Sequence, residues 1–350
     1  MNYAKINTSY FCGADLHALS MYIKIVDKAG QVLFKRNMPN NFDLFKETLE
    51  PFAGEISVGC ESTFNYYWLY DGCKDAGIPF YLGHAAYMKA ISGNKKKNDP
   101  LDAETIAHLM RSNLFPEAYS YPKEMRAVRD LLRRRRRLVH IRSEANTHVQ
   151  LLLRQQGIIS FKGKDVKSVS GKEEILKAIS DGDIHYLVNI DLIVIRQLDE
   201  LIGSIEKQIK ERVYIHNGVD FGLLKTISGV GDMLALSILY ETHDINRFPS
   251  EQKYASYSRV IRVKRSSAGR SKNGNNSKMG NPYLKSAFGQ ILSHARQSSE
   301  RIDAYYQKLE VKRCPKLARG IMAHMFCVAA YHMLKKKMAF DEKRFLRVTS

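Results

Sequence analysis

The stretch from Gly93 to Met110 reads GNKKKNDPLDAETIAHLM and has the pattern of a helix start behind a basic loop. Asp99 suits the N-cap and Pro100 suits the first helical position. Asp102 follows Asp99 by three residues, so both carboxylates are expected on one side of the first turn. By itself, such a pattern is most often only a capped helix, so its meaning depends on partners elsewhere in the chain.

Two further acids stand at the ends of predicted strands upstream of this helix. Asp15 ends a short apolar run that begins at Ser9, and Glu61 follows the buried-strand pattern of residues 56–60. The chain from residue 8 to residue 36 reads as a three-stranded antiparallel meander. Alternating helix and strand patterns follow to about residue 115, which predicts an α/β domain over residues 1–118. Ligands of open α/β sheets collect at such strand ends and helix starts.

Asp15, Glu61, Asp99 and Asp102 therefore form a candidate cluster of four carboxylates. Without a cation, four crowded carboxylates would repel one another and raise each other's pKa values. Oxygen-rich clusters suit the hard cations Mg²⁺ and Mn²⁺. Two such ions roughly 3.5–4 Å apart can hold a phosphodiester and stabilise its leaving oxygen. The cluster is therefore interpreted as a metal site beside DNA.

The charge of the chain favours a polyanionic partner. Lys and Arg number 55 against 36 Asp and Glu, which gives a net charge of +19. Nucleic acid is the first candidate and an anionic membrane surface the second. We expect no membrane span, because no apolar run approaches about 20 residues, and we see no signal peptide. The five scattered cysteines suggest neither a disulfide framework nor a zinc site, which fits a reducing cytoplasm.

Two long helical patterns, from residue 122 to about 156 and from 187 to 213, predict an antiparallel coiled-coil arm over residues 119–215. Five consecutive arginines lie in the first of them. A helix spreads consecutive residues around its circumference, so these arginines cannot all face one surface. A plain linker or a dimerisation element is the alternative, and oligomerisation and nucleic-acid contact both stay open.

The remaining chain, residues 216–350, reads as a mostly helical domain with two special segments. Leu224 to Gly231 is a glycine-rich turn between helices that resembles a helix-hairpin-helix element, in which backbone amides face a DNA phosphate. A tight interhelical turn is the alternative. Residues 259–285 are basic, polar and glycine-rich without apolar periodicity, which indicates an ordered functional loop; a disordered linker is the alternative.

In their order and spacing, these segments resemble the one-ten family of bacterial insertion-sequence transposases, with Piv-type DNA invertases as relatives. The N-terminal part resembles the RuvC-like (RNase H fold) DEDD domain of that family, and the C-terminal part resembles its second domain. The segments that carry the resemblance are Gly13-Ala14-Asp15, Glu61, the run from Lys97 to Ala103, Leu224 to Gly231, Arg247-Phe248, Ala255-Ser256-Tyr257 and the run from Ser277 to Asn281.

The resemblance implies a recombinase that cuts and rejoins DNA when an insertion sequence moves. It implies Mg²⁺ (or Mn²⁺) at Asp15, Glu61, Asp99 and Asp102, and a serine nucleophile in the C-terminal domain that forms a covalent phosphoserine link. It further implies a guide RNA from the element, which selects element ends and target DNA by base pairing, and assembly as dimers and tetramers. The expected location is the bacterial cytoplasm, at the nucleoid.

The nucleophile implied by the resemblance falls on a Ser-Ser pair where family members carry Ser-Gly. Counting back 11 positions from Ser277 gives Ser266, and the departure from Ser-Gly leaves Ser267 as an alternative. A second departure is His17-Ala18 after Asp15, where many relatives have a lysine nearby.

Two other functions compete with the recombinase. One is a metal-dependent nuclease or Holliday-junction resolvase that uses water, and the other is a non-catalytic nucleic-acid-binding protein. The residues expected to bind nucleic acid are Lys95, Lys96, Lys97, Arg133, Arg134, Arg135, Arg136, Arg137, Gly229, Gly231, Arg262, Lys264, Arg265, Arg270 and Lys278.

Overall fold

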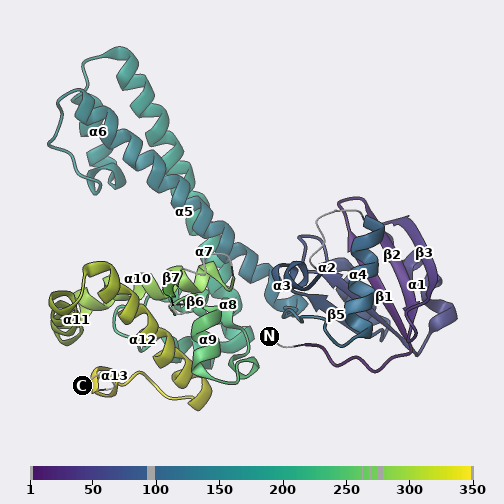
Figure 1. Cartoon of the computed structure of the whole chain (residues 1–350). Coiled ribbons are helices and arrows are strands. Elements are labelled where there is room, and N and C mark those ends of the chain that lie inside the picture. The colour runs from purple at the N-terminus through teal and green to yellow at the C-terminus, as the bar shows by residue number, and fades with distance from the viewer. Residues whose placement is uncertain (1–2, 93–98, 262, 268–269, 275–278, 348–350) are drawn as a thin grey trace. The chain divides into compact units, whose positions relative to one another are not determined.

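The computed structural model describes residues 3–92, 99–261, 263–267, 270–274 and 279–347 (Figure 1). The chain divides into two compact units, Met1–Lys123 and Glu124–Ser350. The first is an α/β unit and the second is mostly helical, as the sequence predicted for the N-terminal and C-terminal parts of the chain. Each unit is described by itself below.

The α/β unit is built on a five-stranded sheet in the order β3-β2-β1-β4-β5. The predicted meander is confirmed, because β1 pairs antiparallel with β2, and β2 with β3. Crossover connections through helices then make β4 parallel to β1 and β5 parallel to β4. This mixed sheet is consistent with an RNase H-like fold. The strands are β1 (Tyr10–Leu16), β2 (Ser20–Asp27), β3 (Val32–Pro39), β4 (Ile56–Glu61) and β5 (Phe80–Gly83).

Helices cover this sheet in two separate apolar clusters. Residues such as Cys12, Phe45 and Leu69 form the cluster that includes the first two helices. Phe11 and Met110 belong to the other cluster, which includes α4. The helices of this unit are α1 (Phe42–Leu49), α2 (Tyr67–Asp75), α3 (Ala85–Ser92) and α4 (Asp99–Arg111), with a 3-10 turn at Glu50–Phe52.

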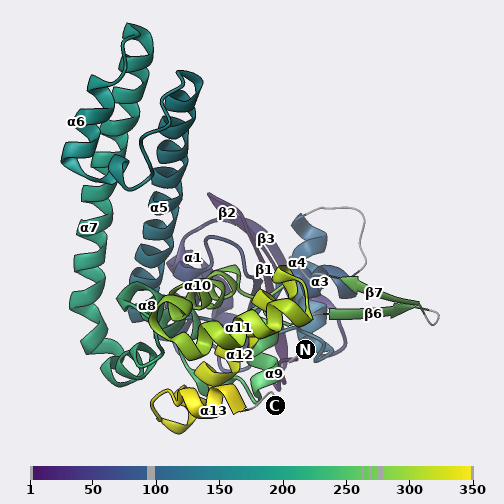
Figure 2. The same cartoon turned by 90° about the vertical axis from the view of Figure 1, so that its left-hand side faces the viewer.

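Two long helices of the second unit, α5 (Lys123–Gln155) and α7 (Gly182–Lys225), run antiparallel (Figures 1 and 2). Ion pairs mark their register: Arg135–Glu206, Arg142–Asp199 and His148–Asp191 join lower numbers on α5 to higher numbers on α7. A 3-10 turn (Asp165–Lys167) and α6 (Val169–Lys177) complete an apolar cluster at the far end of the pair. The structure thus shows a helix pair where the arm was expected, and a supercoiled arm stays a prediction.

The other helices of this unit surround one large apolar core that includes Tyr240, Tyr254, Phe288 and Phe326, all fully buried. Side-chain caps begin several of these helices; for example, the Asn281 side chain accepts hydrogen bonds from two backbone N–H groups of α10. The elements are α8 (Asp232–Thr242), a 3-10 turn (Ile245–Arg247), α9 (Glu251–Tyr257), α10 (Pro282–Ser298), α11 (Glu300–Lys312), α12 (Pro315–Lys336) and α13 (Glu342–Arg347).

Among the described residues, one helix, α12, is long enough and apolar enough to cross a membrane, judged by length and composition alone. The sequence predicts no membrane span, because Arg319 and Lys335 limit the uncharged run of α12 to fewer than about 20 residues. Half of its apolar stretch is buried inside the protein. Met322, Phe326 and Leu334 of α12 belong to the core of the helical unit. This packing is that of a core helix of the helical unit.

The basic segment 259–285 contains a β-hairpin where the sequence predicted an irregular loop. Strands β6 (Val263–Ser267) and β7 (Arg270–Gly274) pair antiparallel, and Ser266 lies opposite Ser271. The loop prediction was wrong for these ten residues, five in each strand. A two-stranded ribbon makes its backbone hydrogen bonds without an apolar face, so its sequence lacks the alternation by which buried strands are predicted.

A buried carboxylate ties α5, α8 and α10 together. Glu241 of α8 is 2% exposed and accepts hydrogen bonds from Arg129 at 3.0 Å, from Arg133 at 2.6 and 2.9 Å, and from the Asn281 amide at 2.8 Å. Burial alone would raise the pKa of Glu241, but the bonds from Arg133, the charges of both arginines and the Asn281 amide lower it below its ordinary value. The ionised form therefore stabilises the fold.

We expect Glu241→Gln to destabilise the helical unit at pH 7 by about 3 kcal/mol, because the nearly buried guanidinium of Arg129 and the partly buried one of Arg133 lose their shared counter-charge. The pKa of Glu241 is lowered on folding, so its contribution is present above the ordinary value of 4.5 and is lost as pH falls through the folded pKa. Urea unfolding followed by circular dichroism at pH 7 and at successively lower pH values measures both effects.

The expected gap between wild type and Glu241→Gln is therefore large at neutral pH and small in acid. The control is Glu300→Gln, which changes an exposed acid in the first turn of α11 and should move the unfolding midpoint little. An equal gap at every pH value would contradict this account of Glu241.

Candidate active site

Strand alternation places Asp15 and Glu61 on the face of the sheet that α4 covers. In β1, Phe11 packs in the α4 cluster and Cys12 in the opposite one. Gly13 continues the α4 side, since a Cβ built on it would meet the backbone oxygen of Ala103 in α4 at 2.0 Å. With a period of two, Asp15 follows on the same side.

The same alternation holds in β4, the parallel neighbour of β1. Cys60 packs in the cluster opposite α4, whereas a Cβ on Gly59 would meet the Met110 sulfur of α4 at 2.4 Å. Glu61 therefore follows on the α4 side. Gly13 pairs with Gly59 and Ala14 pairs with Cys60, so Asp15 and Glu61 end adjacent strands at the same edge of the sheet.

Helix α4 begins at Asp99 and carries Asp99 and Asp102 in its first turn. Its position on the sheet is fixed by an ion pair between Glu104 of α4 and Lys24 of β2. The side chain of Lys24 is only 10% exposed. The hydrogen bond from Lys24 is the main cause that holds the pKa of Glu104 below its ordinary value. This contact and the glycine packing bring the first turn of α4 to the end of β1.

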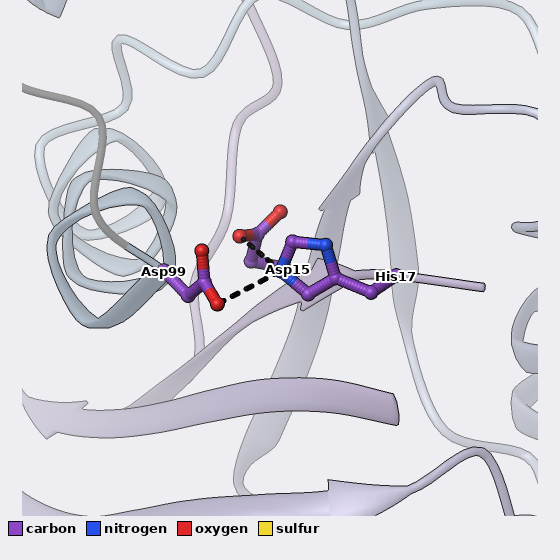
Figure 3. A group of neighbouring side chains, drawn as sticks. All are labelled: Asp15, His17 and Asp99. Carbon is purple, nitrogen blue, oxygen red and sulfur yellow. Dashed lines mark ion pairs between the residues drawn. The ribbon is translucent and has the colours of Figure 1, made fainter. Parts of the chain in front are cut away.

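Three side chains meet at this place: Asp15, Asp99 and His17 (Figure 3). The Nε2 atom of His17 lies 3.3 Å from Oδ2 of Asp15 and 3.2 Å from Oδ2 of Asp99. One ligand atom from each residue lies within 4.8 Å of the other two. The side chain of Asp15 is 13% exposed, while those of His17 and Asp99 are 44% and 56% exposed, so the group is open to solvent on one side.

The carboxylate of Asp15 is influenced by the charges of the other three predicted acids. Burial is the largest cause that raises the pKa of Asp15 above its ordinary value, and His17 opposes it. The charges of Asp102, Asp99 and Glu61 each raise that pKa further. This is the repulsion expected of a carboxylate cluster without a cation. Carboxylate oxygens and an imidazole nitrogen at these spacings form a donor set that fits a divalent metal ion.

His17 was not predicted as a site residue from the sequence, where it was noted only as a departure from the family pattern. A usable signal was present. His17 follows Asp15 by two positions, so an extended backbone carries both side chains to the same face of the sheet.

The five arginines of α5 divide into two groups. Arg133 binds Glu241 and Arg135 binds Glu206, so these two are held inside the helical unit. Arg134, Arg136 and Arg137 are exposed. The guanidinium groups of Arg133 and Arg136 also lie 4.3 and 5.1 Å from the centre of the Tyr283 ring. The exposed arginines are the ones placed to meet a polyanion.

The glycine-rich turn lies between the end of α7 and the start of α8, as predicted for a turn between helices; its likeness to a helix-hairpin-helix element stays a prediction. Gly229 has φ of +79°, and a Cβ there would come within 2.5–2.8 Å of the α10 backbone at residues 294–295. This glycine is therefore required by conformation and close packing. Gly231 is the N-cap of α8 and has no side chain to satisfy the first N–H groups of that helix.

A cavity of about 470 Å³ lies beside this turn. Its walls include Arg135 and Arg136 of α5, Gly229 and Gly231, and His294 of α10. Acids line the same hollow: Glu206 pairs with Arg135 there, and Asp232, the first residue of α8, pairs with Lys210.

Several other predicted residues lie in or around the β-hairpin. The backbone of β6 carries Lys264, Arg265 and Ser266, and β7 begins at Arg270. The expected nucleic-acid contacts Lys95, Lys96, Lys97, Arg262 and Lys278 lie outside the described residues.

Two sequence families match this chain, one in each part. Residues 12–157 match a family of DEDD transposases of the IS110 type, described as transposase. Residues 222–307 match a family described as "Transposase IS116/IS110/IS902 family". The chain belongs to the IS110 family of DEDD transposases. The resemblance seen in the sequence is thereby confirmed.

Two curated relatives, each described as a transposase, align with this transposase over most of their length. It is 22% identical over 302 residues to the transposase for insertion sequence element IS1111A of Coxiella burnetii (strain RSA 493 / Nine Mile phase I), which covers 82% of this chain and 79% of that protein. It is 23% identical over 295 residues to a probable family 20 transposase of Pseudomonas aeruginosa (strain PAO1), with 83% of each chain covered.

Family membership implies a divalent metal ion in this transposase. The group formed by Asp15, His17 and Asp99 is where three possible ligand atoms come together in the part of the transposase that the structure describes.

Proposed function

We propose that this transposase cuts and rejoins DNA with two sets of residues. Asp15, Glu61, Asp99 and Asp102 hold Mg²⁺ or Mn²⁺, and Ser266 is the nucleophile. The observation that carries the proposal is geometric: Asp15 at the end of β1 and Asp99 in the first turn of α4 meet at His17, and β4, which ends at Glu61, is the parallel neighbour of β1.

When bound, the metal supplies Lewis-acid stabilisation of the charge that develops on the phosphodiester. The chain's own residues fix where that happens. Asp15 and Glu61 extend from adjacent strands of a rigid sheet, and Asp99 and Asp102 extend from the first turn of α4. The Lys24–Glu104 ion pair holds α4 on the sheet. Rigid elements of this kind keep the carboxylates in place while DNA arrives.

The proposed chemistry is two successive transesterifications. The Ser266 hydroxyl attacks the DNA phosphorus and loses its proton, a serine–phosphate bond forms, and the bond to one deoxyribose oxygen breaks to leave a free DNA hydroxyl. A DNA hydroxyl then attacks the phosphoserine, a new phosphodiester forms, and serine regains its proton. One phosphoester bond is made for each one broken, so rejoining needs no ATP. The basic residues Lys264, Arg265 and Arg270 of the same hairpin support this assignment by their charge.

Nucleic-acid binding by the helical unit is proposed on charge and exposure. Arg134, Arg136 and Arg137 are exposed on α5 within a chain of net charge +19. The exposed Arg136 and the N-terminus of α8 both line the cavity beside Gly231 and are groups of the kind that bind phosphate. In this proposal, DNA and a guide RNA from the element are the partners, and dimers or tetramers are the working assembly.

The nucleophile is tested by trapping a covalent protein–DNA adduct on end-labelled element DNA with Mg²⁺ present, followed by a denaturing gel. We expect Ser266→Ala to remove the adduct and to lower strand exchange by about a thousandfold or more. Ser267→Ala should keep both. The matched control is Ser271→Ala, at the position opposite Ser266 in the hairpin, which should also keep both.

Other results identify other chemistry. Loss of the adduct in Ser267→Ala alone would move the nucleophile by one position. Metal-dependent cleavage without an adduct in the wild type indicates a nuclease or junction resolvase that uses water. Salt-sensitive binding without cleavage indicates a non-catalytic nucleic-acid-binding protein.

A further inference from the structure

His17 lies between two of the carboxylates that are proposed to hold the metal. Its Nε2 atom is 3.3 Å from an oxygen of Asp15 and 3.2 Å from an oxygen of Asp99 (Figure 3). Donor atoms that share one octahedral ion at about 2.1–2.2 Å lie roughly 3 Å apart. The His17 nitrogen is therefore already separated from each of the two oxygens as neighbouring ligands of one ion are, and one ligand atom from each of the three residues lies within 4.8 Å of the others.

The backbone of His17 is anchored from three directions. Its N–H donates to the Ser20 carbonyl at 2.8 Å. Its own carbonyl accepts from the Asn40 amide at 2.9 Å and from the Asn65 amide at 2.6 Å. These hydrogen bonds hold the backbone of His17, and with it the attachment point of the imidazole, at the end of β1.

One of these anchors also joins His17 to the loop that follows Glu61. The Asn65 side-chain oxygen accepts a hydrogen bond from the Thr63 hydroxyl at 3.0 Å, and the Thr63 N–H donates to the Glu61 carbonyl at 2.7 Å. His17 is thus positioned by the segment that carries another of the four acids.

The chemistry of an imidazole at this position differs from that of a carboxylate. Mg²⁺ prefers oxygen ligands and a near-ideal octahedron, whereas first-row transition ions accept imidazole nitrogen readily. Replacing one oxygen ligand or water by a nitrogen ligand therefore strengthens the binding of such ions while adding little for Mg²⁺.

We infer that His17 is a metal ligand through Nε2 and that it biases this site toward first-row transition ions, Mn²⁺ and Co²⁺ among them, over Mg²⁺. The inference rests on the proposed function, since it needs a metal at Asp15. It adds a nitrogen ligand to a site proposed as four carboxylates.

The test is metal binding to the full-length protein without DNA. Calorimetric titrations with MnCl₂, CoCl₂ and MgCl₂ give the three dissociation constants, and pulsed electron paramagnetic resonance of bound Mn²⁺ detects nitrogen ligands. In His17→Ala we expect Mn²⁺ and Co²⁺ affinity to fall about tenfold or more while Mg²⁺ affinity changes less than about threefold. The nitrogen coupling seen with wild-type protein should disappear.

Two variants make the result specific. His108→Ala changes another histidine of the α/β unit, on α4 near Glu104, and should retain the affinities and the nitrogen coupling. Asn65→Ala keeps the imidazole but removes an anchor, and should weaken Mn²⁺ binding partially. Unfolding followed by the fluorescence of Trp68, the one tryptophan of the chain, checks that each variant is folded.

The inference is overturned by three results. If His17 only neutralises the acids, His17→Ala binds all three ions equally well or more tightly. If wild-type protein shows no nitrogen coupling, the imidazole is not a ligand. If His17→Ala weakens Mg²⁺ as much as Mn²⁺, there is no bias between ions. Failure of the proposed metal site is distinguishable, because Asp15→Asn would then bind every ion as wild type does.

Discussion

Replacing Asp15 by Asn should abolish metal-dependent strand cleavage, with a loss of about a thousandfold or more. Asp15 contacts His17, which also contacts Asp99, and three other acids act on its carboxylate. An amide of the same shape keeps the packing but removes the charge that would hold the ion. Cleavage of labelled element DNA in Mg²⁺, measured at single turnover, gives the rate.

The α/β unit should stay folded in Asp15→Asn, so the loss of cleavage is not caused by unfolding. Burial and three like charges make the ionised Asp15 carboxylate unfavourable in the ion-free protein, so an uncharged amide does not weaken the α/β unit. DNA binding measured by fluorescence anisotropy should also persist. The matched control is Asp75→Asn, an exposed acid at the end of α2, which should cleave at the wild-type rate. Normal cleavage by Asp15→Asn would sink the proposed metal site.

Gly13→Ala should separate the two halves of the acidic cluster although Gly13 touches no ligand. A Cβ at this position would lie 2.0 Å from the Ala103 oxygen and 2.7 Å from the Ala107 nitrogen, both in the backbone of α4. Backbone atoms cannot move aside as a flexible side chain can, so the whole helix must shift and carry Asp99 and Asp102 with it. We expect a loss of about 3 kcal/mol in the stability of the α/β unit and loss of Mn²⁺ binding.

Trp68 on α2 makes this measurable, since it is the one tryptophan of the chain and lies in the α/β unit. Its fluorescence should report an earlier urea transition in Gly13→Ala, while circular dichroism shows the helical unit unchanged. Gly203→Ala on α7 is the control; a Cβ there meets nothing within 4 Å, so it should leave the Trp68 transition and Mn²⁺ binding unchanged. A wild-type Trp68 transition in Gly13→Ala, with normal Mn²⁺ affinity, would contradict the close-packing account.

Local patterns in the sequence predicted the elements that carry the acids. The strands ending near Asp15 and Glu61 were predicted within a residue or two of β1 and β4, and the helix start at Asp99 is where α4 begins. These features are local: alternation, a proline at a helix start and a run of apolar residues do not depend on distant contacts.

The β-hairpin formed by β6 and β7 was not predicted, because its side chains show no local pattern. Its pairing of Ser266 with Ser271 uses backbone hydrogen bonds, which any side chains can accompany. Polar and basic residues therefore gave no periodicity to follow. The same limit applied to the arginine run: the sequence could not say that Arg133 binds Glu241, over 100 positions away, while Arg134 is exposed.

The sequence by itself determined the four acids, their placement at element ends and the family to which the chain belongs. Only the tertiary structure decided that Asp99 lies beside Asp15, because that contact depends on how closely α4 approaches two glycines of the sheet, Gly13 and Gly59. Only the tertiary structure also decided that His17 lies between them. Its place depends on hydrogen bonds from Asn40 and Asn65, and contacts between such distant positions leave no periodic trace along the chain.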